Sequence, residues 1–162
     1  MLKIRQYLHH NHTEIQKNMK KRLLLLTACF ASTSVMAACP SNGKTIFHCT
    51  TNKNYVLQLC DQGKNIHYSF GKARQTPEMA LAVARHKAKT WQWHGAGRTE
   101  SYSVSVPNGN TTYRVFSSFD KIDMQSSSGV EVERNGKLLT TIYCNENKPM
   151  VDRLMGVDLP AE

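Results

Sequence analysis

Apolar and polar residues alternate over short stretches from Lys44 onward, which is the pattern of β-strands with one buried face. Polar turns rich in Gly, Asn and Asp separate these stretches. The alternation predicts strands at residues 45–49, 55–60, 65–70, 101–106, 112–117, 130–133 and 138–144. Asn-Gly pairs at 108–109 and 135–136 predict hairpin turns, because they tolerate the positive φ that two-residue turns require.

Residues 76–84 satisfy two patterns at once. A threonine and a proline open the segment as they would open a helix, and alanines follow. The same residues also alternate, with Met79, Leu81 and Val83 on one face and alanines on the other. The pattern alone slightly favours a helix, whereas the short spacing and the β-rich neighbours favour a strand, since a lone helix needs a face to cover. We expect a strand over 79–84.

These segments predict an all-β fold, a small antiparallel β-barrel or sandwich of about eight strands that is stapled by disulfides. The polar residues 118–128 are expected to link two strands, and the serine-rich residues 126–129 indicate a solvated linker rather than a second probing loop. A barrel would place its first and last strands side by side. That arrangement favours a Cys49–Cys144 bridge and leaves Cys39 with Cys60, although four cysteines allow three pairings.

The N-terminal residues indicate a targeting segment. Residues 19–37 contain a short basic stretch, a mostly apolar run and small residues before Ala38, as in a secretory signal peptide. The apolar run is shorter than the ~20 residues that a membrane-spanning helix needs. Residues 1–18 are polar and rich in histidine, and we expect an upstream mis-start, with initiation at Met19, rather than a cytoplasmic extension. The predicted mature part is one domain, residues 38–162.

Cysteine parity favours soluble export over lipid anchoring. The residues before Cys29 and Cys39 resemble lipoprotein cleavage sites. Cleavage before Ala38 instead leaves an even set: Cys39, Cys49, Cys60 and Cys144. Four cysteines suit two disulfides in an oxidising compartment, whereas lipidation of Cys39 would leave one cysteine unpaired. We therefore expect a periplasmic or secreted protein with no stable membrane span.

The charge of the mature part is modest once the leader is removed. The chain contains 21 Lys and Arg and 12 Asp and Glu, a net charge of +9. Residues 1–37 hold six of the basic residues and one of the acids, which leaves 15 basic and 11 acidic residues, or +4. The remaining basic residues are scattered, whereas a nucleic-acid site needs a clustered stripe. We expect no nucleic-acid partner.

The polar residues do not form the spacings that enzymes or metal sites require. Glu131 and Glu133 alternate with valines, as on the exposed face of a strand. The histidines of the mature part show no paired ligand spacing, and the cysteines are not in Cys-x-x-Cys pairs. No glycine-rich phosphate loop follows a strand. We expect no enzymatic activity, no cofactor and no metal.

A candidate binding loop occupies residues 91–98, where both tryptophans of the chain occur. Its chemistry-bearing residues are Trp91, Trp93, His94, Gly95, Gly97 and Arg98. Rigid rings provide contact area, and glycines let the backbone approach a partner. Arg98 could enter an acidic cleft or pair with a carboxylate. The tryptophans share a strand face by parity, so both belong to the core or both form an exposed patch, which Tyr102 and Tyr113 could border.

Four features resemble the periplasmic and membrane-bound inhibitors of c-type lysozyme from Gram-negative bacteria. They are Cys49 in an early strand, Gly-Ala-Gly-Arg at 95–98, Tyr-Arg-Val-Phe-Ser at 113–117 and Cys144 at the end of the last strand. Those inhibitors insert a loop into the cleft of the host enzyme, so the resemblance implies Arg98 or Lys121 facing an acidic cleft. The family's loop has the pattern Ser-x-Ser-Gly-x-x-Tyr, whereas this chain has glycine and alanine there.

We therefore expect an exported binding or inhibitor domain that presents residues 91–98 to a protein partner. The resemblance implies that this partner is a lysozyme or another muramidase, that is, a lysozyme-like cell-wall hydrolase. The alternative is a structural or adhesive cell-envelope protein without an enzyme target, in which the tryptophans belong to the core.

Overall fold

The computed structural model describes Cys39 and residues 43–162, which belong to the unit Val35–Glu162. The predicted signal peptide at 19–37 and the residues before it lie outside the described residues. The elements are β1 (Lys44–Thr50), β2 (Tyr55–Asp61), β3 (Asn65–Lys72), β4 (Met79–Ala84), the 3₁₀ turn η2 (Arg85–Lys87), β5 (Lys89–Gln92), β6 (Thr99–Asn108), β7 (Thr111–Asp120), β8 (Gln125–Arg134), β9 (Lys137–Tyr143) and β10 (Val151–Asp152). Within the described residues no helix has the length and apolar character to cross a membrane.

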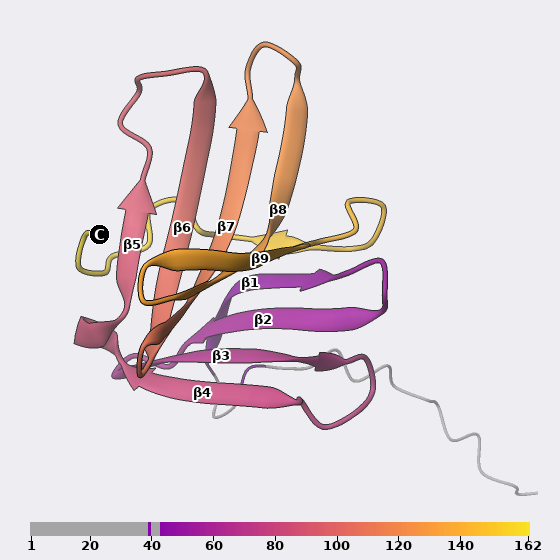
Figure 1. Cartoon of the computed structure of the whole chain (residues 1–162), viewed down its shortest axis with the longest axis vertical. Coiled ribbons are helices and arrows are strands. Elements are labelled where there is room, and N and C mark those ends of the chain that lie inside the picture. Colours follow the sequence, from indigo (N-terminus) through magenta and orange to yellow (C-terminus); the bar gives the residue numbers. More distant parts are fainter. Residues whose placement is uncertain (1–38, 40–42) are drawn as a thin grey trace, which may run out of the picture. The chain divides into compact units, whose positions relative to one another are not determined.

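The strands form two separate antiparallel sheets, ordered β10-β1-β2-β3-β4 and β5-β6-β7-β8-β9. In Figure 1 strands β5 to β8 of the second sheet run across β1 to β4 of the first, as in an orthogonally packed sandwich, whereas β9 is turned toward the direction of β1 to β4. The predicted all-β class is confirmed, and the sandwich, not the closed barrel, is the arrangement observed. The segment 79–84 is strand β4, as expected, because it pairs along its whole length with β3.

Two strands were not expected from the pattern. β5 has four residues and β10 has two, so neither is long enough to show alternation. Trp91 consequently lies in β5 instead of in the predicted loop. β5 pairs with β6, and this pairing, which is a tertiary contact, is what makes the segment a strand.

The core lies between the facing sides of the two sheets. Its fully buried side chains include Phe47, Leu57, Leu59, Ile66, Tyr68, Val104, Val106, Val115, Val130 and Leu154. Each such side chain contributes roughly 1.5–3 kcal/mol relative to leaving it exposed. Tyr68 from the first sheet stacks on Tyr113 from the second, with ring centroids 5.1 Å apart.

Both expected disulfides are present. Cys39 pairs with Cys60, and Cys49 pairs with Cys144, with Cα–Cα distances of 5.7 and 5.8 Å. Cys144 follows β9 and forms an isolated bridge with Thr51, which follows β1. The second disulfide therefore connects the end of β1, in the first sheet, to the residue that follows β9, in the second.

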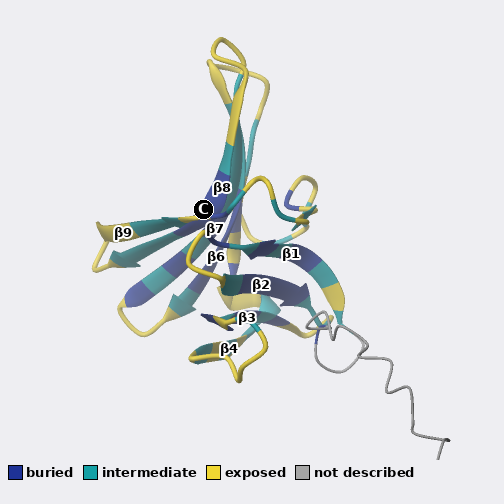
Figure 2. Cartoon of the chain, turned by 90° about the vertical axis from the view of Figure 1, so that its right-hand side faces the viewer, coloured by how far each residue is buried: buried dark blue, intermediate teal, exposed yellow. Residues whose placement is uncertain are grey.

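The central strands of the second sheet extend beyond the first sheet. β6, β7 and β8 have ten residues each, and their upper ends rise above β1–β4 in Figure 1. On the core-facing side the residues change from valine to serine along two of these strands, from Val115 to Ser117 on β7 and from Val130 to Ser128 on β8. In Figure 2 the exposed colour appears toward the upper ends of β7 and β8, and Ser128 itself is still buried.

The prediction of a linker at 118–128 is therefore wrong. These residues continue β7 and β8, with a turn only at 121–124. Ser117, Ser118 and Phe119 pair with Ser128, Ser127 and Ser126. Polar side chains concealed the strands in the sequence, because alternation of apolar residues reports burial of one face against the core, and the first sheet does not cover this part of β7 and β8.

Candidate functional site

Two loops meet at the free end of the second sheet. They are residues 93–98 between β5 and β6 and residues 121–124 between β7 and β8, and we call them together the paired-loop tip. Both loops lie at the upper end of the sheet in Figure 1. The backbone amide of Lys121 donates to the carbonyl of Arg98 at 3.2 Å, so the two loops are directly hydrogen-bonded.

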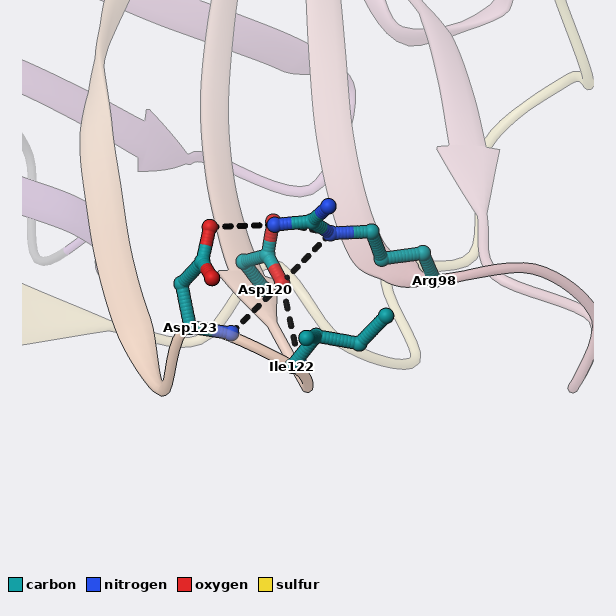
Figure 3. A network of polar contacts seen from close by, with 4 residues as sticks. All are labelled: Arg98, Asp120, Ile122 and Asp123. Atoms are coloured by element: carbon teal, nitrogen blue, oxygen red, sulfur yellow. Dashed lines mark hydrogen bonds and ion pairs between the residues drawn. The ribbon is translucent and has the colours of Figure 1, made fainter.

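Arg98 clamps the two loops together, as Figure 3 shows. Its Nε donates to both carboxylate oxygens of Asp120, at 2.8 and 2.7 Å, and its Nη2 donates to Asp123. Asp120 Oδ1 also accepts the backbone amides of Ile122 at 2.9 Å and Asp123 at 3.1 Å. One carboxylate therefore shapes the turn and holds the neighbouring loop.

These contacts keep both partners of the clamp charged. The hydrogen bond from Arg98, together with the turn amides of Asp123 and Ile122, lowers the pKa of Asp120 to about 2. The hydrogen bond to Asp120 in turn raises the pKa of Arg98. The guanidinium is thus paired with two carboxylates of its own chain, and in this structure Arg98 positions the loop rather than projecting as a free cation.

The loop 93–98 is also closed on itself. The indole Nε1 of Trp93 donates to the carbonyl of Ala96 at 2.7 Å, and Lys121 Nζ lies 4.4 Å from the Trp93 ring centroid in a cation–π contact. Gly95 and Gly97 have φ of +86° and +92°, a region that favours glycine. The glycines are therefore required by the turn itself.

Two apolar side chains that the sequence analysis did not single out lie at the end of the tip. Ile122 and Met124 are 69% and 70% exposed, in the turn between β7 and β8. The available signal was the presence of two large apolar residues in a stretch that was expected to be polar linker. His94 and Lys121 are exposed on the same two loops.

The remaining predicted binding residues are distributed over different surfaces. Trp91 is 45% exposed on β5 and meets His94 edge to face, with centroids 5.8 Å apart. Because β5 ends at Gln92, the strand parity that predicted a common face for the two tryptophans does not extend to Trp93. Tyr102 is half-buried and donates to Glu100 at 2.8 Å.

The prediction that Tyr113 borders the binding surface is wrong. Tyr113 is buried in the core against Tyr68. Tyr113 and Val115 are two residues apart on β7, so their side chains lie on the same, core-facing side of the sheet, and the side chain of Arg114 lies on the other side. An alternating strand shows which residues share a face but not which face is covered.

A hollow of about 480 Å³ lies near the tip on the core-facing side of the extension. Its lining includes Ser117, Ser126 and Ser128 together with the carboxylates of Glu146 and Asp152. Within the part of the chain that the structure describes, no group of three or more His, Cys, Asp or Glu is placed to hold a metal ion. Tyr102, Phe119, Met150 and Met155 line the same hollow, so it combines apolar and aromatic surface with hydroxyls and carboxylates.

Comparisons with protein-family models, curated proteins and solved structures find no match for this chain. Function is therefore inferred from the geometry of the sheet and its loops.

Proposed function

We propose that this chain is an exported binding domain, periplasmic or secreted, that inserts the paired-loop tip into the cleft of a lysozyme-like cell-wall hydrolase and inhibits it. The observation that supports this most directly is the Arg98 clamp, which joins two loops into one protrusion that ends in Ile122 and Met124. The two disulfides support export, because disulfides persist in oxidising compartments.

A pre-formed protrusion suits insertion into a cleft. Ordering a flexible side chain at an interface costs ~0.5–1.5 kcal/mol, so loops that are already fixed lose less on binding. In the tip, Trp93, Arg98, Asp120 and Lys121 all have partners within the chain. A few anchor side chains that fill pockets contribute most of the affinity in typical interfaces, and the exposed turn residues Ile122 and Met124 are placed to act as such anchors.

Charge is expected to have a secondary part in this binding. Arg98 and Lys121 are balanced by Asp120 and Asp123. Lys121 is the exposed cation of the turn, next to the apolar residues, and it would face the carboxylates of an acidic cleft. We therefore expect inhibition that depends weakly on salt, because the net charge of these four residues is zero.

Inhibition of cell-wall lysis by the purified protein tests this proposal, with a panel of muramidases as targets. The double variant Ile122→Ser/Met124→Ser is expected to raise the inhibition constant at least tenfold, since a tenfold change needs only ~1.4 kcal/mol. Leu138→Ser/Leu139→Ser is the matched control, because it removes two exposed apolar residues at the start of β9. The proposal is wrong if the wild-type protein inhibits no muramidase, or if both double variants inhibit equally.

A further inference from the structure

The outer face of the second sheet contains a row of aromatic residues that crosses all five strands. The strand register places these residues side by side in the order Trp91, Ser103, Phe116, Gly129 and Tyr143. Large rings thus alternate with small residues. Trp91 and Tyr143 are 45% and 57% exposed at the two ends of the row, and Phe116 meets Tyr143 edge to face at 6.1 Å.

Polar residues follow this aromatic row on both sides. One neighbouring row consists of Ser101, Ser118 and Ser127, and the other includes Ser105, Arg114 and Glu131. The hydroxyls of Ser118 and Ser127 lie 2.9 Å apart. The outer face is therefore a strip of rings between a strip of hydroxyls and a strip of charged groups.

The three rows line a hollow of about 510 Å³. Its floor includes Ser103, which is only 3% exposed and whose Oγ has no hydrogen-bond partner among the described residues. Nε of Arg114, in the charged row, likewise has none there. Buried polar groups are usually hydrogen-bonded, and an unpaired one costs about 1–3 kcal/mol, so each such group calls for an explanation. Their place in the hollow points to a ligand that has hydrogen-bonding groups of its own.

Carboxylates hold Arg114 at the edge of the hollow. Nη1 of Arg114 lies 3.5 Å from both Glu131 and Glu133, and Nη2 lies 3.6 Å from Glu162. Glu162 also accepts a hydrogen bond from the Ser105 hydroxyl. Three carboxylates around one guanidinium leave this edge negatively charged. It offers charge-assisted acceptors to hydroxyl donors and repels anionic ligands.

We propose that this outer face binds a linear glycan of neutral, β-1,4-linked pyranoses, laid across the strands along the row from Trp91 to Tyr143. A pyranose with equatorial substituents has C–H faces that stack on aromatic rings and an edge of hydroxyls that needs polar partners. The backbones of Trp91 and Phe116 lie on alternate strands, ~9–10 Å apart across the sheet, and two pyranose units of an extended β-1,4 chain have a length similar to this backbone spacing. This site lies on the face of the sheet and is distinct from the paired-loop tip.

Titration with cellotetraose and with the N-acetylated chitotetraose tests this inference, by calorimetry and by tryptophan fluorescence of the intact protein. At least one of the two is expected to bind. Trp91→Ala and Tyr143→Ala are each expected to weaken binding at least tenfold, with the circular dichroism spectrum unchanged. Ser103→Ala is expected to weaken binding severalfold without lowering the melting temperature, because the hydroxyl that it removes has no partner within the protein.

The tip variant Ile122→Ser/Met124→Ser is the control, and it is expected to bind the tetrasaccharide as the wild type does. This separates the two proposals, since hydrolase inhibition can fail while glycan binding holds. Failure of both tetrasaccharides to bind would overturn the inference, as would equal binding by wild type and Trp91→Ala. Stronger binding of a polyuronate than of the neutral probes would contradict the neutral class. Loss of hydrolase inhibition in Trp91→Ala, without glycan binding by the wild type, would identify a protein interface instead.

Discussion

Arg98 shows how far a side chain's role depends on partners that are distant in the sequence. Its type and its place after a glycine-rich turn predicted a cation available to a partner. In the structure it is paired with Asp120 and Asp123, which are 22 and 25 residues further along the chain. The pairing exists because β6 and β7 are adjacent and both extend to the same free end of the sheet. Residues at the two open ends of so long a hairpin are too far apart in the sequence for their pairing to appear as a local sequence pattern.

The Arg98 clamp predicts the titration of Asp120. Because its folded pKa is lowered from 3.8 to about 2, the stability that this pair contributes is complete above about pH 4 and is lost as the pH falls through about 2. Carboxyl chemical shifts followed by NMR are expected to show this low pKa, and in Arg98→Gln the pKa is expected to move back toward 3.8. An unchanged pKa in Arg98→Gln would show that the turn amides alone determine it.

Gly129 is required by the close approach of two strands. A Cβ at this position would lie 2.2 Å from the carbonyl oxygen of Ile142 on β9. Gly129→Ala therefore has to separate β8 from β9, and we expect a loss of ~3 kcal/mol in the free energy of unfolding, the upper part of the range for overpacking. Urea denaturation measures it, with Ser126→Ala on the same strand as a control that should change stability by less than ~0.5 kcal/mol. Equal effects of the two substitutions would contradict the close approach.

At the scale of elements, strands were predictable wherever one face is covered. Segment 79–84 was ambiguous in the sequence, and pairing with β3 makes it a strand. The upper halves of β7 and β8 have no covering sheet, and their serines gave no alternation. Strand ends of this kind are stabilised by ladder hydrogen bonds within the sheet, which depend on the neighbouring strand and not on the side chains.

The two disulfides are expected to contribute unequally to stability. Cys49–Cys144 closes 95 residues and Cys39–Cys60 closes 21. In the chain-entropy treatment these loops correspond to about 4.7 and about 3.3 kcal/mol, because a longer loop removes more freedom from the unfolded chain. The double variants Cys49→Ala/Cys144→Ala and Cys39→Ala/Cys60→Ala, unfolded in urea without reductant, test the order. A larger loss from the second variant would show that contacts near Cys39, not loop length, determine the difference.

At the scale of the whole described part, the second sheet packs its inner face against the first sheet to form the core. Two other surfaces of the second sheet, the paired-loop tip and the outer face, are not covered by the first sheet. The first sheet covers only the lower halves of β6, β7 and β8, so their upper ends bring the two loops of the tip together. The outer face has no covering layer among the described strands, and its register aligns the aromatic row. The proposed hydrolase contact and the proposed glycan site therefore use different parts of the same sheet.

The sequence by itself determined the all-β class, most strand positions and the presence of two disulfides, since these follow from alternation, turn residues and cysteine parity; which cysteines pair was settled by the fold. Only the tertiary structure decided that the sheets form a sandwich and that Tyr113 is buried. It alone also placed Arg98 against Asp120, and Trp91 in line with Phe116 and Tyr143. The physical reason is common to these cases. Local patterns report which residues share a face, whereas the partner strand, its register and the layer that covers it are contacts between distant parts of the chain.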